Sequence, residues 1–102
     1  MCTITIKKSN NLTVRIDDKI TRQSKADALC KKLVPNKEYV LSWFIIAEPT
    51  TKYSLEIVSP PGMLWKTLTN EAWNSSKLKI DKELRGKKDM GFIFIKCPEN
   101  SE

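Results

Sequence analysis

The side chains best suited to bind a ligand lie between residues 65 and 79, where two tryptophans are followed by an amide and two lysines. Trp73 falls in a polar stretch, and Trp65 follows the turn-forming residues Pro60-Pro61-Gly62. An indole ring on an exposed loop can stack on a sugar ring or a base, or anchor a protein interface. For both tryptophans we favour a ring that packs back on the core, and a ligand-binding ring is the alternative. The candidate ligand-binding residues are Trp65, Trp73, Asn74, Lys77 and Lys79.

The composition argues against catalysis, because the chain contains no histidine. Ser-His-Asp and Cys-His nucleophilic catalysis, histidine acid–base chemistry and histidine-ligated metals are therefore excluded. Carboxylates cluster only at Asp17-Asp18 and at Asp81-x-Glu83, and neither cluster has the setting of a calcium loop. We interpret both clusters as turn residues, and we expect no enzymatic activity, no cofactor and no metal site.

The three cysteines, Cys2, Cys30 and Cys97, are dispersed along the chain. An odd and dispersed set is not a disulfide framework, and three thiols cannot complete a four-thiolate zinc site. We favour three reduced thiols. The alternative is a bridge between Cys2 and Cys97, since the first and last strands of a sandwich often lie close together.

The chain shows no signal peptide, so it is either intracellular or begins after a cleavage site.

The charge balance is basic, with 18 lysines and arginines against 12 acidic residues and a net charge of +6. Such a charge attracts nucleic acid, anionic lipid or acidic glycan. Acidic residues are interleaved with the lysines that follow Trp73, and no nucleic-acid-binding motif is present. Nucleic acid is therefore an alternative partner that we do not favour. No apolar run approaches the roughly 18 residues that span a bilayer.

The elements that must position these side chains are short strands. Residues 2–7 and 12–16 alternate apolar and polar side chains, as half-buried strands do, and we expect them to form a hairpin. Residues 38–47 are apolar on both faces, which indicates a strand covered on both sides. With residues 52–58 they predict a second hairpin. Further strands are expected at 63–68, 78–81 and 91–97, and the inward side chains of the first hairpin are Ile4, Ile6, Leu12, Val14 and Ile16.

Residues 24–34 fit two structures. Ser24 and Asp27 resemble a capping box, and Ala26, Leu29, Cys30 and Leu33 would share one helical face. Pro35 would end such a helix. We favour a short helix near residues 25–33, and an irregular strand is the alternative.

One segment resembles a known family. Residues 33–43 read Leu33-Val34-Pro35-Asn36-Lys37-Glu38-Tyr39-Val40-Leu41-Ser42-Trp43. This is similar to a phrase of jelly-roll carbohydrate-binding modules, in which a short turn leads into a core strand. The resemblance implies a sandwich fold with sugar as a ligand. This chain has Asn36 where the modules have a glycine and is shorter than they are, and no ligand-binding residue carries over.

The sequence as a whole predicts a single all-β domain over residues 1–102, an antiparallel sandwich of the immunoglobulin-like or jelly-roll kind. We expect a non-catalytic binding module with a carbohydrate as its first candidate ligand. The alternative is a protein-interaction domain, such as an inhibitor, immunity or adaptor protein, that uses loops at one end of the sandwich. A weak polyanion binder is the third reading. The protein is expected to be a monomer or a weak homodimer, in which the apolar strand at 91–97 would pair across an edge.

Overall fold

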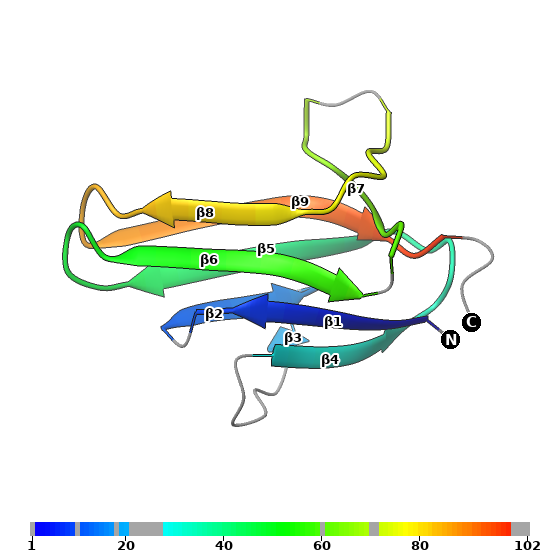
Figure 1. Ribbon diagram of the computed structural model, residues 1–102, viewed down its shortest axis with the longest axis horizontal. Helices are drawn as coiled ribbons and strands as arrows, with labels where there is room; N and C mark the ends of the chain where they lie inside the picture. Colours follow the sequence, from blue (N-terminus) through cyan, green and yellow to red (C-terminus); the bar gives the residue numbers. More distant parts are fainter. Residues whose placement is uncertain are drawn as a thin grey trace.

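The computed structural model describes residues 2–9, 11–17, 19–20, 28–59, 61–69 and 72–98. Within these ranges there is no helix, and the strands form two antiparallel sheets that lie one in front of the other in Figure 1. The strands are β1 (Cys2–Lys8), β2 (Leu12–Ile16), β3 (Lys19–Ile20), β4 (Ala28–Leu33), β5 (Tyr39–Ile46), β6 (Lys52–Ser59), β7 (Leu64–Lys66), β8 (Lys79–Glu83) and β9 (Lys88–Lys96). The prediction of an all-β antiparallel sandwich is confirmed.

The first sheet has four strands in the order β4-β1-β6-β8, and the second has five in the order β3-β2-β5-β9-β7. Strands that follow one another in the chain are therefore placed in opposite sheets, except β2 and β3, which pair with each other in the second sheet. The two predicted hairpins are wrong, because β1 pairs with β4 and β6, and β5 pairs with β2 and β9. A strand that crosses to the other sheet still points its apolar side chains into the same core. Two consecutive strands therefore show the same alternation of apolar and polar residues whether they pair as a hairpin or lie in opposite sheets.

The expected helix near residues 25–33 is also wrong where the structure describes it. Residues 28–33 form strand β4, which pairs with β1 from Cys2 opposite Leu33 to Lys7 opposite Ala28. Residues 25–27 lie outside the described residues. The pairing fills the free edge of β1, and this tertiary contact outweighs a weak local preference for helix. The alternative of a strand is the correct one for residues 28–33.

The core lies between the sheets and is built from the inward side chains that the alternation predicts. These residues come from both sheets in similar numbers, so neither sheet could bury its apolar side without the other. The inward residues of the first predicted hairpin are all buried. The buried aliphatic and aromatic core residues are Ile4, Ile6, Leu12, Val14, Ile16, Leu33, Tyr39, Leu41, Trp43, Ile45, Tyr53, Leu55, Ile57, Met63, Leu78, Leu84, Ile93 and Ile95.

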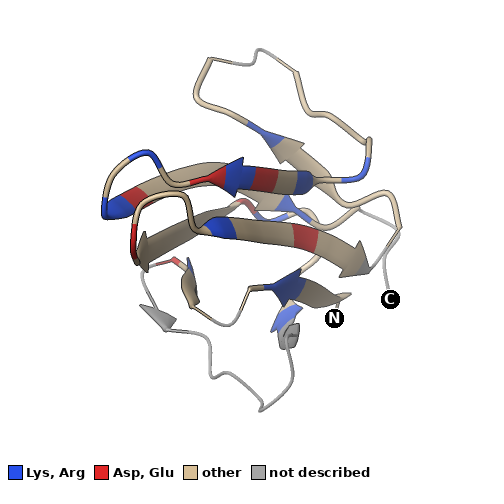
Figure 2. Cartoon of the chain, turned by 60° about the vertical axis from the view of Figure 1, so that its left-hand side comes forward, with Lys and Arg blue, Asp and Glu red and all other residues tan. Residues whose placement is uncertain are grey.

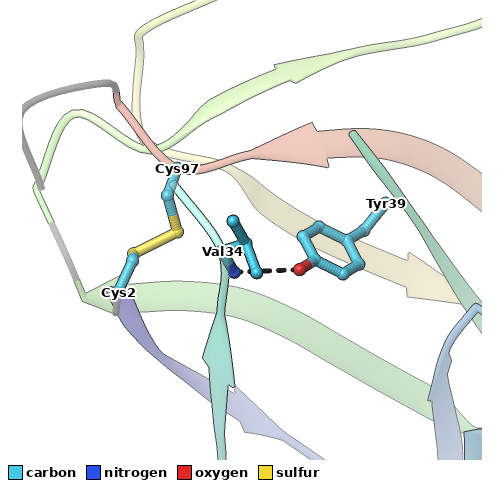
Figure 3. Close-up of a disulfide and its surroundings, with 4 residues drawn as sticks. All are labelled: Cys2, Val34, Tyr39 and Cys97. Carbon is cyan, nitrogen blue, oxygen red and sulfur yellow. Dashed lines mark hydrogen bonds between the residues drawn. A yellow bond between two sulfur atoms is a disulfide. The ribbon is translucent and has the colours of Figure 1, made fainter. Parts of the chain in front are cut away.

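A disulfide joins the two sheets at one end of the sandwich (Figure 3). It links Cys2 at the start of β1 to Cys97 just after β9, across 95 residues, with the Cα atoms 6.4 Å apart. The expectation of reduced thiols is wrong for these two cysteines, because the fold brings the ends of their strands within bridging distance. Beside the bridge, the Val34 amide donates a hydrogen bond of 2.9 Å to the Tyr39 hydroxyl.

Asn36 lies at the turn that precedes β5, where carbohydrate-binding modules carry glycine. Its φ is 64°, in the left-handed region that asparagine tolerates better than most residues. The Asn36 amide donates to the carbonyl of Cys97 over 3.0 Å, so the turn is fastened to the end of β9. Asparagine thus adopts here the conformation that a glycine would otherwise provide.

Candidate functional site

The structure brings three of the sequence-predicted site residues together on and beside β7. Trp65 and Asn74 form an isolated β-bridge, with amide-to-carbonyl distances of 3.0 and 2.8 Å. The Trp65 indole nitrogen donates to the carbonyl of Ser76 over 2.8 Å. The Trp65 ring is half-buried against the core. Trp65 and Asn74 therefore hold the segment around Trp73 in place.

Trp73 is half-buried, and its ring is already in contact with two cations. The ammonium groups of Lys66 on β7 and Lys96 on β9 each lie 4.7 Å from the ring centroid. This is the geometry of a cation–π interaction. A sugar or base stacking on the same part of the ring would have to displace these lysines.

The other two predicted residues, Lys77 and Lys79, belong to the side of the four-stranded sheet. The Lys77 ammonium lies 3.2 Å from a carboxylate oxygen of Glu56. Lys79 on β8 stands opposite the same glutamate on β6. The predicted site residues are thus divided between the two sheets.

The outer face of the four-stranded sheet is charged and mixed in sign. Figure 2 shows basic and acidic residues alternating along β8, with further charges on β6. Opposite charges face each other in two cross-strand pairs, Glu56 with Lys79 and Lys52 with Glu83. Asp81 and Glu83, which we interpreted as turn residues, lie on strand β8 instead. Charges arranged in this way are those of a solvated surface.

The outer face of the five-stranded sheet is apolar at its centre. We call this centre, made of Val40, Phe44, Ile46, Met90, Phe92 and Phe94, the apolar face. Strand pairing sets Phe44 opposite Met90 and Val40 opposite Phe94. The exposed fractions are 37% for Phe44, 67% for Ile46, 67% for Met90 and 48% for Phe92. The outward side of β5 was expected to be covered, and this expectation is wrong because these side chains are open to solvent.

A groove of about 600 Å³ runs into the apolar face. Its lining residues come from three neighbouring strands, and they are Thr13, Arg15, Ser42, Trp43, Phe44, Met90, Gly91 and Phe92. Gly91 faces Trp43 across the β5–β9 pair. A Cβ atom on Gly91 would lie 2.3 Å from the Trp43 ring, so only glycine leaves room for that indole. Because Trp43 is buried in the core, this glycine makes room for a core side chain, a role that the sequence alone does not mark.

Basic residues surround the apolar face. Arg15 flanks Ser42 on the neighbouring strand, Lys88 lies opposite Ile46 at one end, and Lys66 pairs with Phe94 at the other. The alternation of β2, β5, β7 and β9 places no carboxylate outward on these strands. Within the described residues, neither Arg15 nor Lys88 forms an ion pair. The apolar face thus has a basic rim formed by Arg15, Lys66, Lys88 and Lys96.

A buried hydrogen bond joins the sheets at the end opposite to the disulfide. The Tyr53 hydroxyl on β6 donates to the carboxylate of Asp89 on β9. This bond lowers the pKa of Asp89 below its usual value. Burial, reinforced by the hydrogen bond to Asp89 and its negative charge, raises the pKa of Tyr53 to about 12. Near neutral pH the pair therefore stays as a neutral tyrosine bonded to a carboxylate, which is a structural arrangement.

The described ranges hold no group of three or more metal-ligating side chains close enough to bind an ion. No helix in those ranges is long and apolar enough to cross a membrane. What the geometry offers for chemistry is thus the apolar face, its groove and its basic rim.

Comparison with known proteins adds no relative to this description. The sequence matches no protein-family model, no curated protein is significantly similar to it, and no solved structure matches its fold. The resemblance of residues 33–43 to carbohydrate-binding modules is therefore supported only in its expectation of a sandwich fold, and sugar binding has no support from any relative. What stands is an all-β antiparallel sandwich with one charged and one apolar outer face.

Proposed function

We propose that this chain is a non-catalytic binding module that docks a protein partner on the apolar face of its five-stranded sheet. The single observation that carries the proposal is the exposure of Phe44, Met90 and Phe92 around one groove. Large exposed apolar patches on soluble proteins typically mark interaction sites. Aromatic and methionine side chains are also enriched in the centres of protein interfaces.

The face favoured here differs from the loops that the sequence pointed to. A sugar module would use Trp73 or Trp65 as a stacking platform. The Trp73 ring is in contact with two lysines, and the Trp65 indole N–H already donates to Ser76. A protein partner on the apolar face requires none of these contacts to be broken. The disulfide favours an oxidising compartment as the place where the partner is met.

The test is to select displayed random peptides on the native protein and to measure their affinity for two double variants. Phe44→Ser/Phe92→Ser removes the centre of the apolar face. Val34→Ser/Val58→Ser is the matched control, because these valines are 45% and 49% exposed and lie outside the apolar face. Both variants should keep the wild-type circular dichroism and unfolding midpoint, since surface substitutions rarely change stability much.

We expect selected peptides to bind the control like the wild type and to bind Phe44→Ser/Phe92→Ser at least tenfold more weakly. A tenfold loss corresponds to about 1.4 kcal/mol, which a central interface residue readily contributes. The proposal fails if no peptide is enriched, or if the enriched peptides ignore the loss of both phenylalanines. Binding of a neutral polysaccharide that is lost in Trp73→Phe would instead support the carbohydrate alternative.

A further inference from the structure

The charges around the apolar face are mostly positive, and this restricts what can cover it. The exception is Asp17, whose carboxylate accepts a hydrogen bond of 2.9 Å from the Val40 amide at one end of the face. Lys88 lies at one end of the β5–β9 pair, Lys66 and Lys96 lie at the other, and Arg15 lies at the side. No carboxylate is directed outward on β2, β5, β7 or β9, as far as the structure describes them. The field over the face is therefore positive, and it favours a partner that carries negative charge at matching places.

A second copy of this chain is a poor occupant. Packing two apolar faces against each other would bring two basic rims together, with only Asp17 of each copy to offset eight positive charges. Like charges brought together in an interface repel and act against the wrong partner. A homodimer packed on this face is thus disfavoured. The sequence allowed a homodimer paired through the edge of residues 91–97 if that strand was not central, and in the structure β7 pairs with this edge from Phe94 to Lys96.

The extent of the face also argues against a small molecule. Lys88 and Lys96 are the two ends of β9. At about 3.4 Å per residue in an antiparallel strand, they stand roughly 27 Å apart. A drug-sized ligand could fill the groove but would leave Ile46 and Phe94 uncovered. A polypeptide segment can span the whole distance between the two basic ends.

The groove distinguishes a polypeptide from a lipid surface. Contact with a bilayer needs no cavity, whereas one large side chain of a protein partner needs a pocket of its own shape. The groove is such a pocket, with Phe44, Met90 and Phe92 as apolar walls and Arg15 at its side. An Arg guanidinium can hold a carboxylate through two parallel hydrogen bonds.

Resting on the proposed function, we infer that the partner segment is acidic and carries a large apolar anchor side chain. The anchor enters the groove between Phe44 and Phe92. A carboxylate near the anchor pairs with Arg15. Further acidic residues face Lys88 at one end of the segment and Lys66 at the other.

The experiment uses the peptides selected above, each with a charge-inverted version in which every Asp and Glu is replaced by Lys. Affinities are measured for the wild type, for Arg15→Glu and for Lys32→Glu, at low salt and at high salt. Lys32 is an exposed residue of β4 in the other sheet, so its reversal makes the same change of net charge away from the apolar face. Vesicles of phosphatidylglycerol serve as the lipid probe.

We expect the selected peptides to carry net negative charge and at least one large apolar residue. Arg15→Glu should lower the affinity of these peptides at least tenfold, and Lys32→Glu should lower it by less than about threefold. The charge-inverted peptides should not bind the wild type. High salt should weaken binding, because exposed charges are screened.

Two results would overturn the inference in distinguishable ways. Peptides that are neutral or basic, or that ignore Arg15→Glu while losing affinity for Phe44→Ser/Phe92→Ser, would refute the acidic partner and leave the docking face standing. Vesicle binding that requires Phe44 and Phe92, with no peptide that does, would identify a membrane surface in place of a protein and would refute both proposals.

Discussion

The two outer faces of this sandwich differ in polarity, although the inward faces behind them are both apolar. On the four-stranded sheet, most of the described side chains that point away from the core are charged or polar, with Val58 on β6 as an exception. Opposite charges stand side by side on β6 and β8. This is the usual state of an antiparallel sheet with one face in water. On the five-stranded sheet, β5 and β9 carry apolar residues outward as well as inward.

This difference means that the apolar face exposes the protein to association with other chains. Exposed apolar surface promotes association with other chains and adds little to the stability of the fold. A scaffold without a partner could place polar residues at Phe44 and Phe92, as it does on the opposite sheet. Their presence around one groove supports the proposal that this face docks a partner.

The largest expected effect comes from the bridge that holds the two sheets together. Cys2→Ala/Cys97→Ala opens a loop of 95 residues, and loop-closure entropy alone predicts a loss of about 4–5 kcal/mol in the free energy of unfolding. Urea denaturation of the wild type and the double variant measures this loss in the free energy of unfolding. Reductant should lower the stability of the wild type to that of the double variant and leave the variant unchanged. A loss below about 1 kcal/mol would mean that packing alone keeps the faces in place.

The next prediction tests the contrast between the inside and the outside of one strand. Ile45 is 1% exposed and its neighbour Ile46 is 67% exposed. We expect Ile45→Ala to cost about 2–5 kcal/mol, because it leaves a cavity in the core, and Ile46→Ala to stay within about 0.5 kcal/mol. Thermal or urea unfolding of both variants gives the values. A large cost for Ile46→Ala would show that something covers the apolar face in the free protein.

The sequence predicted the strands other than β3 and β4, and their inward residues, because a period of two is visible within most of these segments. It did not predict the pairing. The short links at Ser9 to Asn11 and at Ala47 to Thr51 read as hairpin turns, yet both cross between the sheets. Local pattern cannot tell these cases apart, because both bury the same side chains. Residues 28–33 became a strand for a similar reason, since only the register with β1 makes them one.

The site was harder to predict than the fold. A search by residue type selected the tryptophans, whereas the apolar face is built from phenylalanine, methionine and isoleucine on strands more than forty residues apart in sequence. Only the β5–β9 register places Phe44 opposite Met90. The available signal was the second apolar set on residues 38–47, which we interpret from the sequence as a covered side, whereas in the structure Phe44 and Ile46 on this side are exposed.

The smallest effect is expected where Tyr53 and Asp89 join the sheets beneath the two faces. The pKa of Tyr53 is raised from 10.0 to about 12, so the folded state favours the neutral hydroxyl. This contribution to stability is complete below pH 10 and is lost as the pH rises from 10 toward 12. Near pH 7, Tyr53→Phe should cost about 1–2 kcal/mol, because the Asp89 carboxylate loses its donor.

The difference between wild type and Tyr53→Phe should therefore shrink between pH 9 and pH 12, as measured by urea unfolding at several pH values. Asp89→Asn is the control that separates the causes. It removes the charge of Asp89 but leaves Tyr53 buried, so the alkaline loss should become smaller without vanishing, since burial is its largest cause. A gap between wild type and Tyr53→Phe that is the same at pH 7 and pH 12 would mean that folding does not raise the pKa of Tyr53, and it would contradict the prediction.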